Sequence, residues 1–510
     1  MTATAGPVPG TEKLDRGVLK VAGVVVLGAI MSILDITVVS VALPTFQSEF
    51  NATYATVAWT MTAYTLALAT VIPITGWAAD RFGTKRLYLM SLVLFVAGSV
   101  LCSVAWDIGP LIVFRALQGL GGGMLMPLGM TIMTRAAGPD RVGRVMAVLG
   151  VPMLLGPIGG PILGGWLIEA ASWHWIFLIN VPIGIAAFIF ALRVLPKDQP
   201  HPAESFDFLG MLLLSPGLAL FLYGVSSIPG EGTFMAAKVL VPALIGLGLV
   251  VAFVLHALRK THPLIDLGLF KNRHLTVSVV TLTLFTVAFM GAMLLMPSYF
   301  LQVRGETTLN AGLLLAPQGL GAMLTMPMAG RLTDRIGPGK LVLPGIVLIA
   351  LGMGVFTQVT ASSSYVLLLG ALFVLGMGMG MTMMPIMSAA LASLTHQQVA
   401  RGSTMMNIIQ QTAGSIGTAV MSVILTNHVL DSPSATAYSA VTQGQVPADQ
   451  VPPGVLAQGQ SALAEAFGST YVVAVVLVVL CLIPALFLPR KRIEKAPDEQ
   501  DLSAVPVAMH

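Results

Sequence analysis

Two ionisable residues stand inside long apolar stretches of the sequence, where a charged group is costly. Asp35 lies in a stretch that extends from residue 18 to residue 43, and Arg115 lies in another, 109–134. A carboxylate in a bilayer core costs several kcal/mol unless it is paired, hydrated or protonated. Because burial favours the neutral form of a carboxyl group, Asp35 is predicted to couple transport to a proton or a cation that binds and leaves. The alternative is a carboxylate held in a permanent ion pair or helix cap.

The two residues are predicted to lie at similar depths. On a helix that rises 1.5 Å per residue, Asp35 lies about 12 Å from the end of its stretch, and Arg115 lies about 9 Å from the start of its own. Both positions fall in the same half of the membrane. An arginine there could keep the carboxylate ionised in one state and release it in another, so contact between the two side chains is the question for the tertiary structure.

These residues are positioned by apolar stretches long enough to cross a bilayer, which takes about 20 residues. Apolar residues make up 56% of the chain and charged ones 9%, whereas soluble proteins average about 25% charged residues. The sequence therefore predicts an all-α polytopic membrane protein. We expect fourteen spans: 18–43, 55–77, 86–106, 109–134, 142–168, 173–195, 208–228, 237–258, 274–299, 311–332, 341–359, 364–393, 402–428 and 468–488.

The basic residues predict the orientation of these spans. An even number of spans places both termini on one side of the membrane, and 23 of the 26 Lys and Arg residues lie on that side. Lys238 and Arg304 are on the opposite side. The positive-inside rule makes the basic side cytoplasmic.

A charged motif occurs twice in the sequence, each time between two apolar stretches. Gly76, Asp80, Arg81 and Gly83 form the first copy, which Arg86 follows. The same frame returns 254 positions later, with Asp334 and Arg335 as its charged pair. A repeated membrane unit of this kind is typical of transporters built from two halves. One interpretation is that these charges hold helix ends together on one side of the membrane, because helix termini attract opposite charges. The alternative is that they only set the topology.

Two further groups of residues indicate close packing and a cavity wall. The stretch 142–168 is dense in small residues and proline, which allow neighbouring helices to approach and bend the helix; its motif residues are Gly150, Gly156, Pro157, Gly159 and Gly160. Asn407 and Gln411 are four residues apart and share one helix face. They are candidates for a cavity wall, and helix–helix hydrogen bonding is the alternative.

Other features of the sequence exclude several classes of function. No nucleophile–base constellation or phosphate-binding loop is present, so we do not expect an enzyme, and we expect no cofactor. Methionine clusters without Cys or His predict adaptable packing rather than a metal site. Because the basic residues lie in short loops, we expect no nucleic-acid partner. The longest connection, 429–467, is rich in Ser, Ala, Pro, Gln and Gly, and we expect a flexible loop there.

Residues 18 to about 490 resemble the major facilitator superfamily, because the motifs occur together and in the same order. Within that superfamily they resemble the fourteen-helix drug:proton antiporter branch. The segments that carry the resemblance are 34–44, 76–86, 114–119, 150–161, 175–184, 299–302, 330–340 and 407–411. The resemblance implies that Asp35 takes part in coupling, that Arg115 supports proton movement and that the loop charges latch helices. Some members with dicationic substrates use an acid within the tenth span. Residues 311–329 contain none, which disfavours divalent cations.

The resemblance also implies a domain organisation and a function. We expect a cytoplasmic tail (1–17), a six-helix bundle (18–197), two additional helices (198–270), a second six-helix bundle (271–489) and a cytoplasmic tail (490–510). The expected function is proton-coupled export of amphipathic or cationic compounds across the inner (cytoplasmic) membrane. Its partners would be the small-molecule substrate, protons and the lipid bilayer; a periplasmic adaptor is left undecided. The alternative is a dedicated exporter of one native metabolite.

Overall fold

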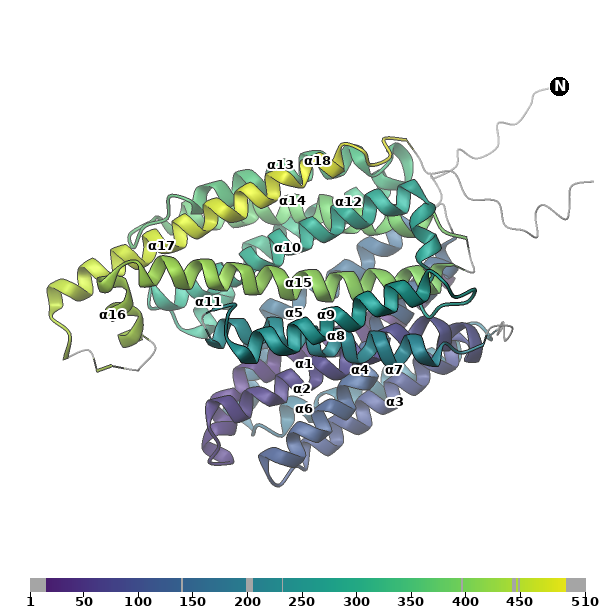
Figure 1. Cartoon of the computed structure of the whole chain (residues 1–510), viewed down its shortest axis with the longest axis horizontal. Coiled ribbons are helices and arrows are strands. Elements are labelled where there is room, and N and C mark those ends of the chain that lie inside the picture. Colours follow the sequence, from purple (N-terminus) through teal and green to yellow (C-terminus); the bar gives the residue numbers. More distant parts are fainter. Residues whose placement is uncertain are drawn as a thin grey trace, which may run out of the picture.

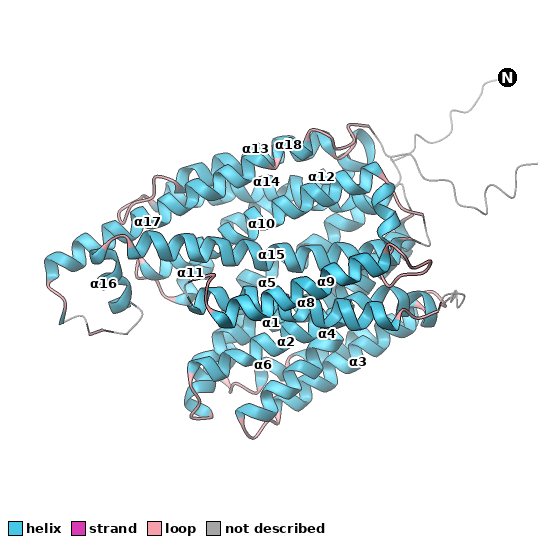
Figure 2. Cartoon of the chain, viewed as in Figure 1, coloured by secondary structure: helices cyan, strands magenta, loops and turns pink. Residues whose placement is uncertain are grey.

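The computed structural model describes residues 15–138, 141–198, 205–231, 233–395, 398–442, 446–447 and 450–491. Within these residues the chain forms helices and no strand (Figure 2). The predicted terminal tails, 1–17 and 490–510, lie mostly outside them. The all-α polytopic fold predicted from composition is confirmed.

The helices fall into a first group, a linking pair and a second group along the chain (Figure 1). The first helix group comprises α1 (Arg16–Glu49), α2 (Tyr54–Phe82), α3 (Thr84–Ser103), α4 (Ile108–Ala137), α5 (Val142–Ala170), α6 (Trp175–Leu178) and α7 (Asn180–Val194). The linking pair is α8 (Phe208–Glu231) and α9 (Ala237–Ala257), followed by the 3-10 helix η2 (Leu267–Lys271). The second helix group comprises α10 (Arg273–Gln302), α11 (Thr308–Leu314), α12 (Ala316–Ile336), α13 (Gly339–Phe356), α14 (Tyr365–Ala392), α15 (Val399–Leu430), α16 (Pro433–Thr442), α17 (Pro453–Leu480) and α18 (Leu482–Ala485).

Among the described residues, twelve helical segments are long and apolar enough to span a membrane. The other two predicted spans, 142–168 and 311–332, correspond to α5 and α12. Helix α12 is less apolar because it contains Gln318 and, in its last turns, Arg331, Asp334 and Arg335. Helix α5 includes positions whose side chains lie outside the described part of the chain.

Two of the predicted spans contain a one-residue irregularity, at Ile179 between α6 and α7 and at Leu315 between α11 and α12. Both residues keep a right-handed helical backbone, and Trp175–Val194 still forms one segment long enough to span a membrane. Pro317 lies in the first turn of α12. Proline is tolerated at such a position because the first turn of a helix needs no backbone N–H donor.

The prediction of a flexible loop at 429–467 is wrong for most of that segment. Helix α16 forms within it, and α17 begins at Pro453, earlier than the predicted span at 468. The two helices pack closely, since a Cβ at Gly459 would lie 2.3 Å from the carbonyl oxygen of Ser434. The abundant alanine that suggested a loop is instead compatible with helix, because alanine has the highest helix propensity.

The two helix groups meet along α5 and α15. Helix α5 packs against α12 and α14, and α15 packs against α2 and α4. Glycines allow the close approach: a Cβ at Gly143 would lie 2.6 Å from the carbonyl oxygen of Gly330, and one at Gly76 would lie 3.4 Å from Cα of Arg401. Two of these close approaches therefore involve the first glycine of each copy of the repeated charged motif, Gly76 and Gly330.

Candidate functional site

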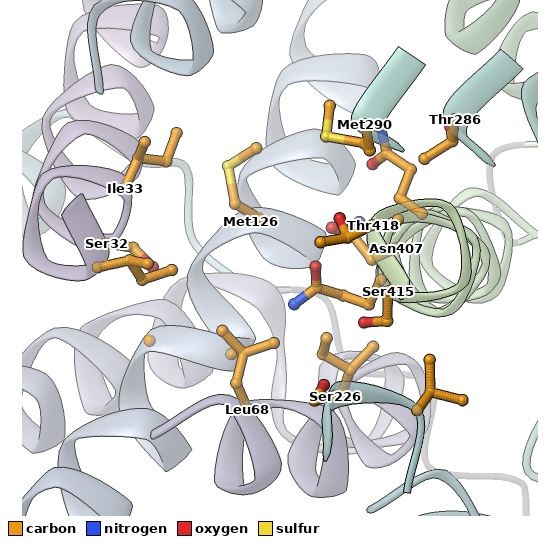
Figure 3. A pocket seen from close by; sticks show the side chains of 18 of the residues that line it. Ser32, Ile33, Leu68, Met126, Ser226, Thr286, Met290, Asn407, Ser415 and Thr418 are labelled. Carbon is orange, nitrogen blue, oxygen red and sulfur yellow. The ribbon is translucent and has the colours of Figure 1, made fainter. Parts of the chain in front are cut away.

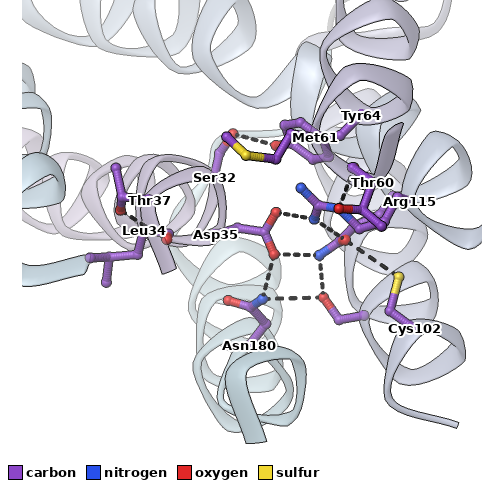
Figure 4. A network of polar contacts seen from close by, with 12 residues as sticks. Ser32, Leu34, Asp35, Thr37, Thr60, Met61, Tyr64, Cys102, Arg115 and Asn180 are labelled. Atoms are coloured by element: carbon purple, nitrogen blue, oxygen red, sulfur yellow. Dashed lines mark hydrogen bonds and ion pairs between the residues drawn. The ribbon is translucent and has the colours of Figure 1, made fainter. Parts of the chain in front are cut away.

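Asp35 on α1 and Arg115 on α4 form an ion pair inside the first helix group (Figure 4). Neither side chain has any exposed surface. The similar depths estimated from the sequence are therefore matched by direct contact. A fully buried pair is stable only if further hydrogen bonds satisfy its remaining polar atoms, because desolvation of both charges costs several kcal/mol.

Two amide side chains supply the further hydrogen bonds to the carboxylate. Gln118 Nε2 donates to Asp35 Oδ1 at 2.7 Å, and Asn180 Nδ2 donates to the same oxygen at 3.2 Å. Both amides also donate to the hydroxyl of Ser99, at 2.7 Å and 3.3 Å. Sequence reasoning did not select these residues as site residues. Gln118 and Asn180 stand in two of the motifs that carried the family resemblance, whereas Ser99 had no signal.

Arg115 is held by three further contacts besides the carboxylate. Its Nη1 donates to Gln118 Oε1 at 2.6 Å, and its Nε donates to the carbonyl oxygen of Thr60 at 3.1 Å. The guanidinium carbon lies 4.3 Å from the centre of the Tyr64 ring, a cation–π distance. Arg115 would therefore keep several partners if the carboxylate became protonated.

A cavity of about 440 Å³ lies between the two helix groups (Figure 3). Its lining mixes apolar side chains and methionines with hydroxyls and amides: Ser32, Ile33, Ile36, Leu68, Ile72, Gly122, Gly123, Met126, Val225, Ser226, Thr286, Met290, Met383, Asn407, Gln410, Gln411, Gly414, Ser415, Thr418 and Ala419. Among the described lining residues, none has an ionisable side chain. Both cavity candidates, Asn407 and Gln411, are among the lining residues.

Asn407 also contacts a neighbouring helix, which was the alternative to a place in the cavity wall. Its Nδ2 lies 3.2 Å from Sδ of Met130 on α4 and donates to the carbonyl oxygen of Ser403 at 2.9 Å. The structure therefore gives Asn407 a position at the junction of the two helix groups as well as in the cavity wall.

The ion pair is separated from the cavity by one layer of side chains. Ser32 lines the cavity and lies 3.2 Å from the Tyr64 hydroxyl, and the Tyr64 ring in turn covers Arg115. Asp35 is 2% exposed and does not line the cavity. A compound in the cavity therefore does not contact Asp35 directly in this conformation.

The small residues of α5 allow it to pack directly on the part of α1 that carries Asp35. A Cβ at Gly156 would lie 2.1 Å from Cγ2 of Ile33, and one at Gly160 would lie 1.9 Å from Oγ1 of Thr37. Thr37 donates a hydrogen bond to the carbonyl oxygen of Gly156 at 3.1 Å. These contacts hold the segment of α1 around Asp35 against α5.

The other motif residues of α5 have different surroundings. Gly150 approaches the second helix group, since its Cβ would lie 2.4 Å from Sδ of Met326. A Cβ at Gly159 would meet no atom closer than 3.7 Å. The side chain of Pro157 lies outside the described residues. The predicted motif is therefore divided between an α1 contact and a contact with the second helix group.

The repeated aspartates contact basic residues of the opposite helix group. Asp80 on α2 lies 3.8 Å from Arg401 at the start of α15 and 3.3 Å from Arg135 on α4. Asp334 on α12 lies 3.6 Å from Arg144 and accepts a hydrogen bond from the backbone N–H of Gly143 at 2.9 Å, at the start of α5. Asp334 is thus placed at the N-terminus of α5, where a negative charge is stabilised.

The glycine and second basic residue of the first motif copy serve the turn itself. Gly83 ends α2 with a φ of 94°, in the region that favours glycine. A Cβ at this position would lie 2.1 Å from the carboxyl carbon of Asp198. That carboxylate accepts hydrogen bonds from the backbone N–H groups of Lys85 and Arg86, at 2.8 Å and 3.0 Å. The described contact of Arg86 therefore caps α3 and does not join the two helix groups.

Known proteins resemble this chain over most of its length. The family model described as "Major Facilitator Superfamily" matches residues 25–418. The "Multidrug resistance protein B homolog" of Mycobacterium tuberculosis (strain ATCC 25618 / H37Rv) is 50% identical over 498 residues, which cover 94% of this chain and 92% of that protein. The "Multidrug export protein EmrB" of Haemophilus influenzae is 31% identical over 397 residues, which cover 77% of this chain and 78% of that protein.

A solved structure shares the fold. The crystal structure of the human organic anion transporter MFSD10 superposes with a TM-score of 0.59, covering 90% of this chain and 99% of that one. The sequence identity is 16%. The similarity therefore concerns the arrangement of helices alone.

Proposed function

Because the chain belongs to the Major Facilitator Superfamily and is thereby a multi-pass membrane transporter, we propose that it exports amphipathic drugs and toxic compounds in exchange for protons. The observation that carries this proposal is a buried, hydrogen-bonded Asp35–Arg115 pair one side-chain layer from a cavity between two helix groups. The printed names of the two relatives support multidrug export over the export of one native metabolite.

The two helix groups act as bundles in this proposal, with residues 18–197 and 271–489 rocking about the cavity and residues 198–270 linking them. The basic side of the membrane protein is cytoplasmic, and both termini lie there. Asp80 with Arg401 and Asp334 with Arg144 then close the cytoplasmic side. In this proposal the cavity opens to the outside while these ion pairs are formed, and alternating access requires them to break.

Coupling follows from competition for Asp35. In the described state the carboxyl group of Asp35 is paired with Arg115. A proton that neutralises Asp35 weakens the attraction, while Arg115 keeps Thr60, Gln118 and the Tyr64 ring. A bound compound reaches this pair through Ser32 and Tyr64. Substrate and proton are coupled because each has a different affinity for the two states of the pair.

The cavity favours amphipathic compounds over small ions. Its hydroxyls and amides can donate and accept hydrogen bonds, and its methionines adapt to different apolar shapes. Promiscuous binding is typical of such surfaces. A cationic compound would be recognised through its apolar body and through the oxygen atoms of Asn407, Gln410 and Gln411, because no carboxylate faces the cavity in this conformation.

The experiment that tests the proposal is ethidium efflux from vesicles under an imposed pH gradient. Wild-type protein should expel the dye only when the gradient is present, and Asp35→Asn should abolish this dependence. Asp107→Asn is the matched control, because Asp107 is an exposed helix cap whose hydrogen bond to Ile108 an asparagine can retain. Full gradient-driven efflux by Asp35→Asn, with correct membrane insertion, would refute the coupling role.

A further inference from the structure

Helix α8, the first of the two linking helices, contributes directly to the cavity. Val225 and Ser226 on α8 are lining residues, together with residues of α1, α2, α4, α10, α14 and α15 (Figure 3). Ser226 is exposed, although it lies within a helix that is otherwise long and apolar. We propose that α8 is a wall of the transport cavity and that Val225 and Ser226 determine the size of compound it accepts. This inference rests on the proposed function.

The packing of α8 fixes its place between the two helix groups. On one side the ring of Tyr223 stacks on Trp59 of α2, with centroids 5.6 Å apart. On the other side Val225 and Ile228 form an apolar cluster with Ala419 and Val423 of α15. Helix α8 therefore covers the gap between α2 and α15, and its inward face completes the cavity there.

Helix α9 supports α8 from the outside. A Cβ at Gly224 would lie 2.7 Å from the carbonyl oxygen of Val239, and one at Gly246 would lie 2.3 Å from the backbone nitrogen of Phe221. In their most apolar segments, 44% of the α8 residues are buried, against 17% for α9. The pair is therefore closely packed, with α9 facing outward and α8 facing the cavity. A flexible tether would need neither this packing nor an inward polar side chain.

The chemistry of the wall indicates what it selects. Val225 is 7% exposed and belongs to the same apolar cluster as Ala419, so this part of the cavity wall is apolar. Ser226 adds a small hydroxyl. A larger side chain at position 226 would occupy cavity volume without disturbing the helix interior, because the serine side chain is exposed. Large compounds should be rejected first, since a difference of one methylene group changes specificity by about 10- to 200-fold.

Cysteine labelling tests the position of the wall. Both native cysteines, Cys102 and Cys481, are buried, so the background is low. In permeabilised vesicles, a water-soluble maleimide should label Ser226→Cys and the loop variant Thr233→Cys, but not Ser215→Cys, which is buried on the same helix. Ethidium should slow the labelling of Ser226→Cys several-fold and leave Thr233→Cys unchanged. Absent labelling of Ser226→Cys, or labelling unaffected by ethidium in protein that binds the dye, overturns the proposal.

Size selection is tested by Ser226→Trp in the same vesicles. The ratio of kcat/KM for a small and a large transported dye should rise at least about tenfold over wild type. An unchanged ratio overturns the role in selection. Failure of the proposed function has a different signature: wild-type vesicles then move no dye under the gradient, while Ser226→Cys labelling, which needs no transport, still reports whether α8 faces the aqueous cavity.

Discussion

The buried ion pair leads to a quantitative prediction about stability. Arg115→Met removes the cation and leaves the Asp35 carboxyl group without its charged partner in a site with no exposed surface. Removing one partner of a buried pair costs about 3–5 kcal/mol. We expect a value near the lower end, about 3 kcal/mol, because Gln118 and Asn180 continue to donate hydrogen bonds to the carboxylate.

Adding Asp35→Asn to Arg115→Met should recover most of the lost stability. In the double variant Asp35→Asn, Arg115→Met, no uncompensated charge remains, and replacing a buried pair by neutral groups is often close to neutral. The free energy of unfolding, measured by detergent titration of purified protein, should therefore be strongly non-additive. The double variant should nevertheless show no proton-coupled efflux, which separates the structural role of the pair from its coupling role.

An exposed ion pair provides the control for this cycle. Lys238 and Glu231 lie 3.1 Å apart, with Lys238 75% exposed, and Lys238→Met should change stability by less than about 1 kcal/mol. If Arg115→Met is no more destabilising than Lys238→Met, or if the losses from Asp35→Asn and Arg115→Met simply add, the pair is not a buried charge pair of the kind described.

Three further substitutions test other parts of the structure. Gly160→Ala should destabilise the protein by about 1–3 kcal/mol through overpacking against Thr37, whereas Gly159→Ala, which has space, should unfold in detergent like wild type. Asp334→Asn should shift the equilibrium between the two conformations toward cytoplasmic opening about tenfold or more, since a hydrogen bond to a charged group is worth about 1.5–3 kcal/mol. Faster maleimide labelling of Thr404→Cys would measure this shift. Asp198→Asn, which affects a cap within one helix group, should not change the labelling rate. Burial raises the pKa of Asp207, but hydrogen bonds from His256 and the backbone of Gly210 and Leu264 outweigh this effect and lower the pKa below its ordinary value. The stabilisation by Asp207 is therefore present above about pH 4 and lost as the pH falls further. Unfolding at several pH values should show that the advantage of wild type over Asp207→Asn disappears in acid, and an advantage independent of pH would contradict this.

Features that depend on local composition could be predicted from the sequence. Apolar stretches of spanning length, the even number of spans and the asymmetry of Lys and Arg all follow from solvation in a bilayer, which acts on each segment separately. Asp35 and Arg115 could be selected for the same reason, because a charge within such a stretch is costly wherever its partners are. The prediction of a flexible loop at 429–467 was wrong at α16 and at the start of α17, because helix propensity and packing outweighed the loop-like composition there.

The partners of those residues were decided by tertiary structure. Ser99 and Thr60 are ordinary residues of apolar helices, and only the packing of α3, α2 and α4 around α1 brings them to the ion pair. The repeated aspartates likewise find their basic partners in the opposite helix group, at distances along the chain that no local pattern encodes. A linking helix such as α8 looks like any other span in sequence, and its place in the cavity wall depends on contacts with α2 and α15.

The sequence by itself thus determined which segments are long and apolar enough to enter a membrane and which buried charges require compensation, because the cost of solvation is a property of each residue in its own stretch. The tertiary structure alone decided how that compensation is made and which side chains surround the cavity. These depend on close packing between helices far apart in the chain, where the absence of a single Cβ at Gly156 or Gly160 determines how near α1 and α5 can come.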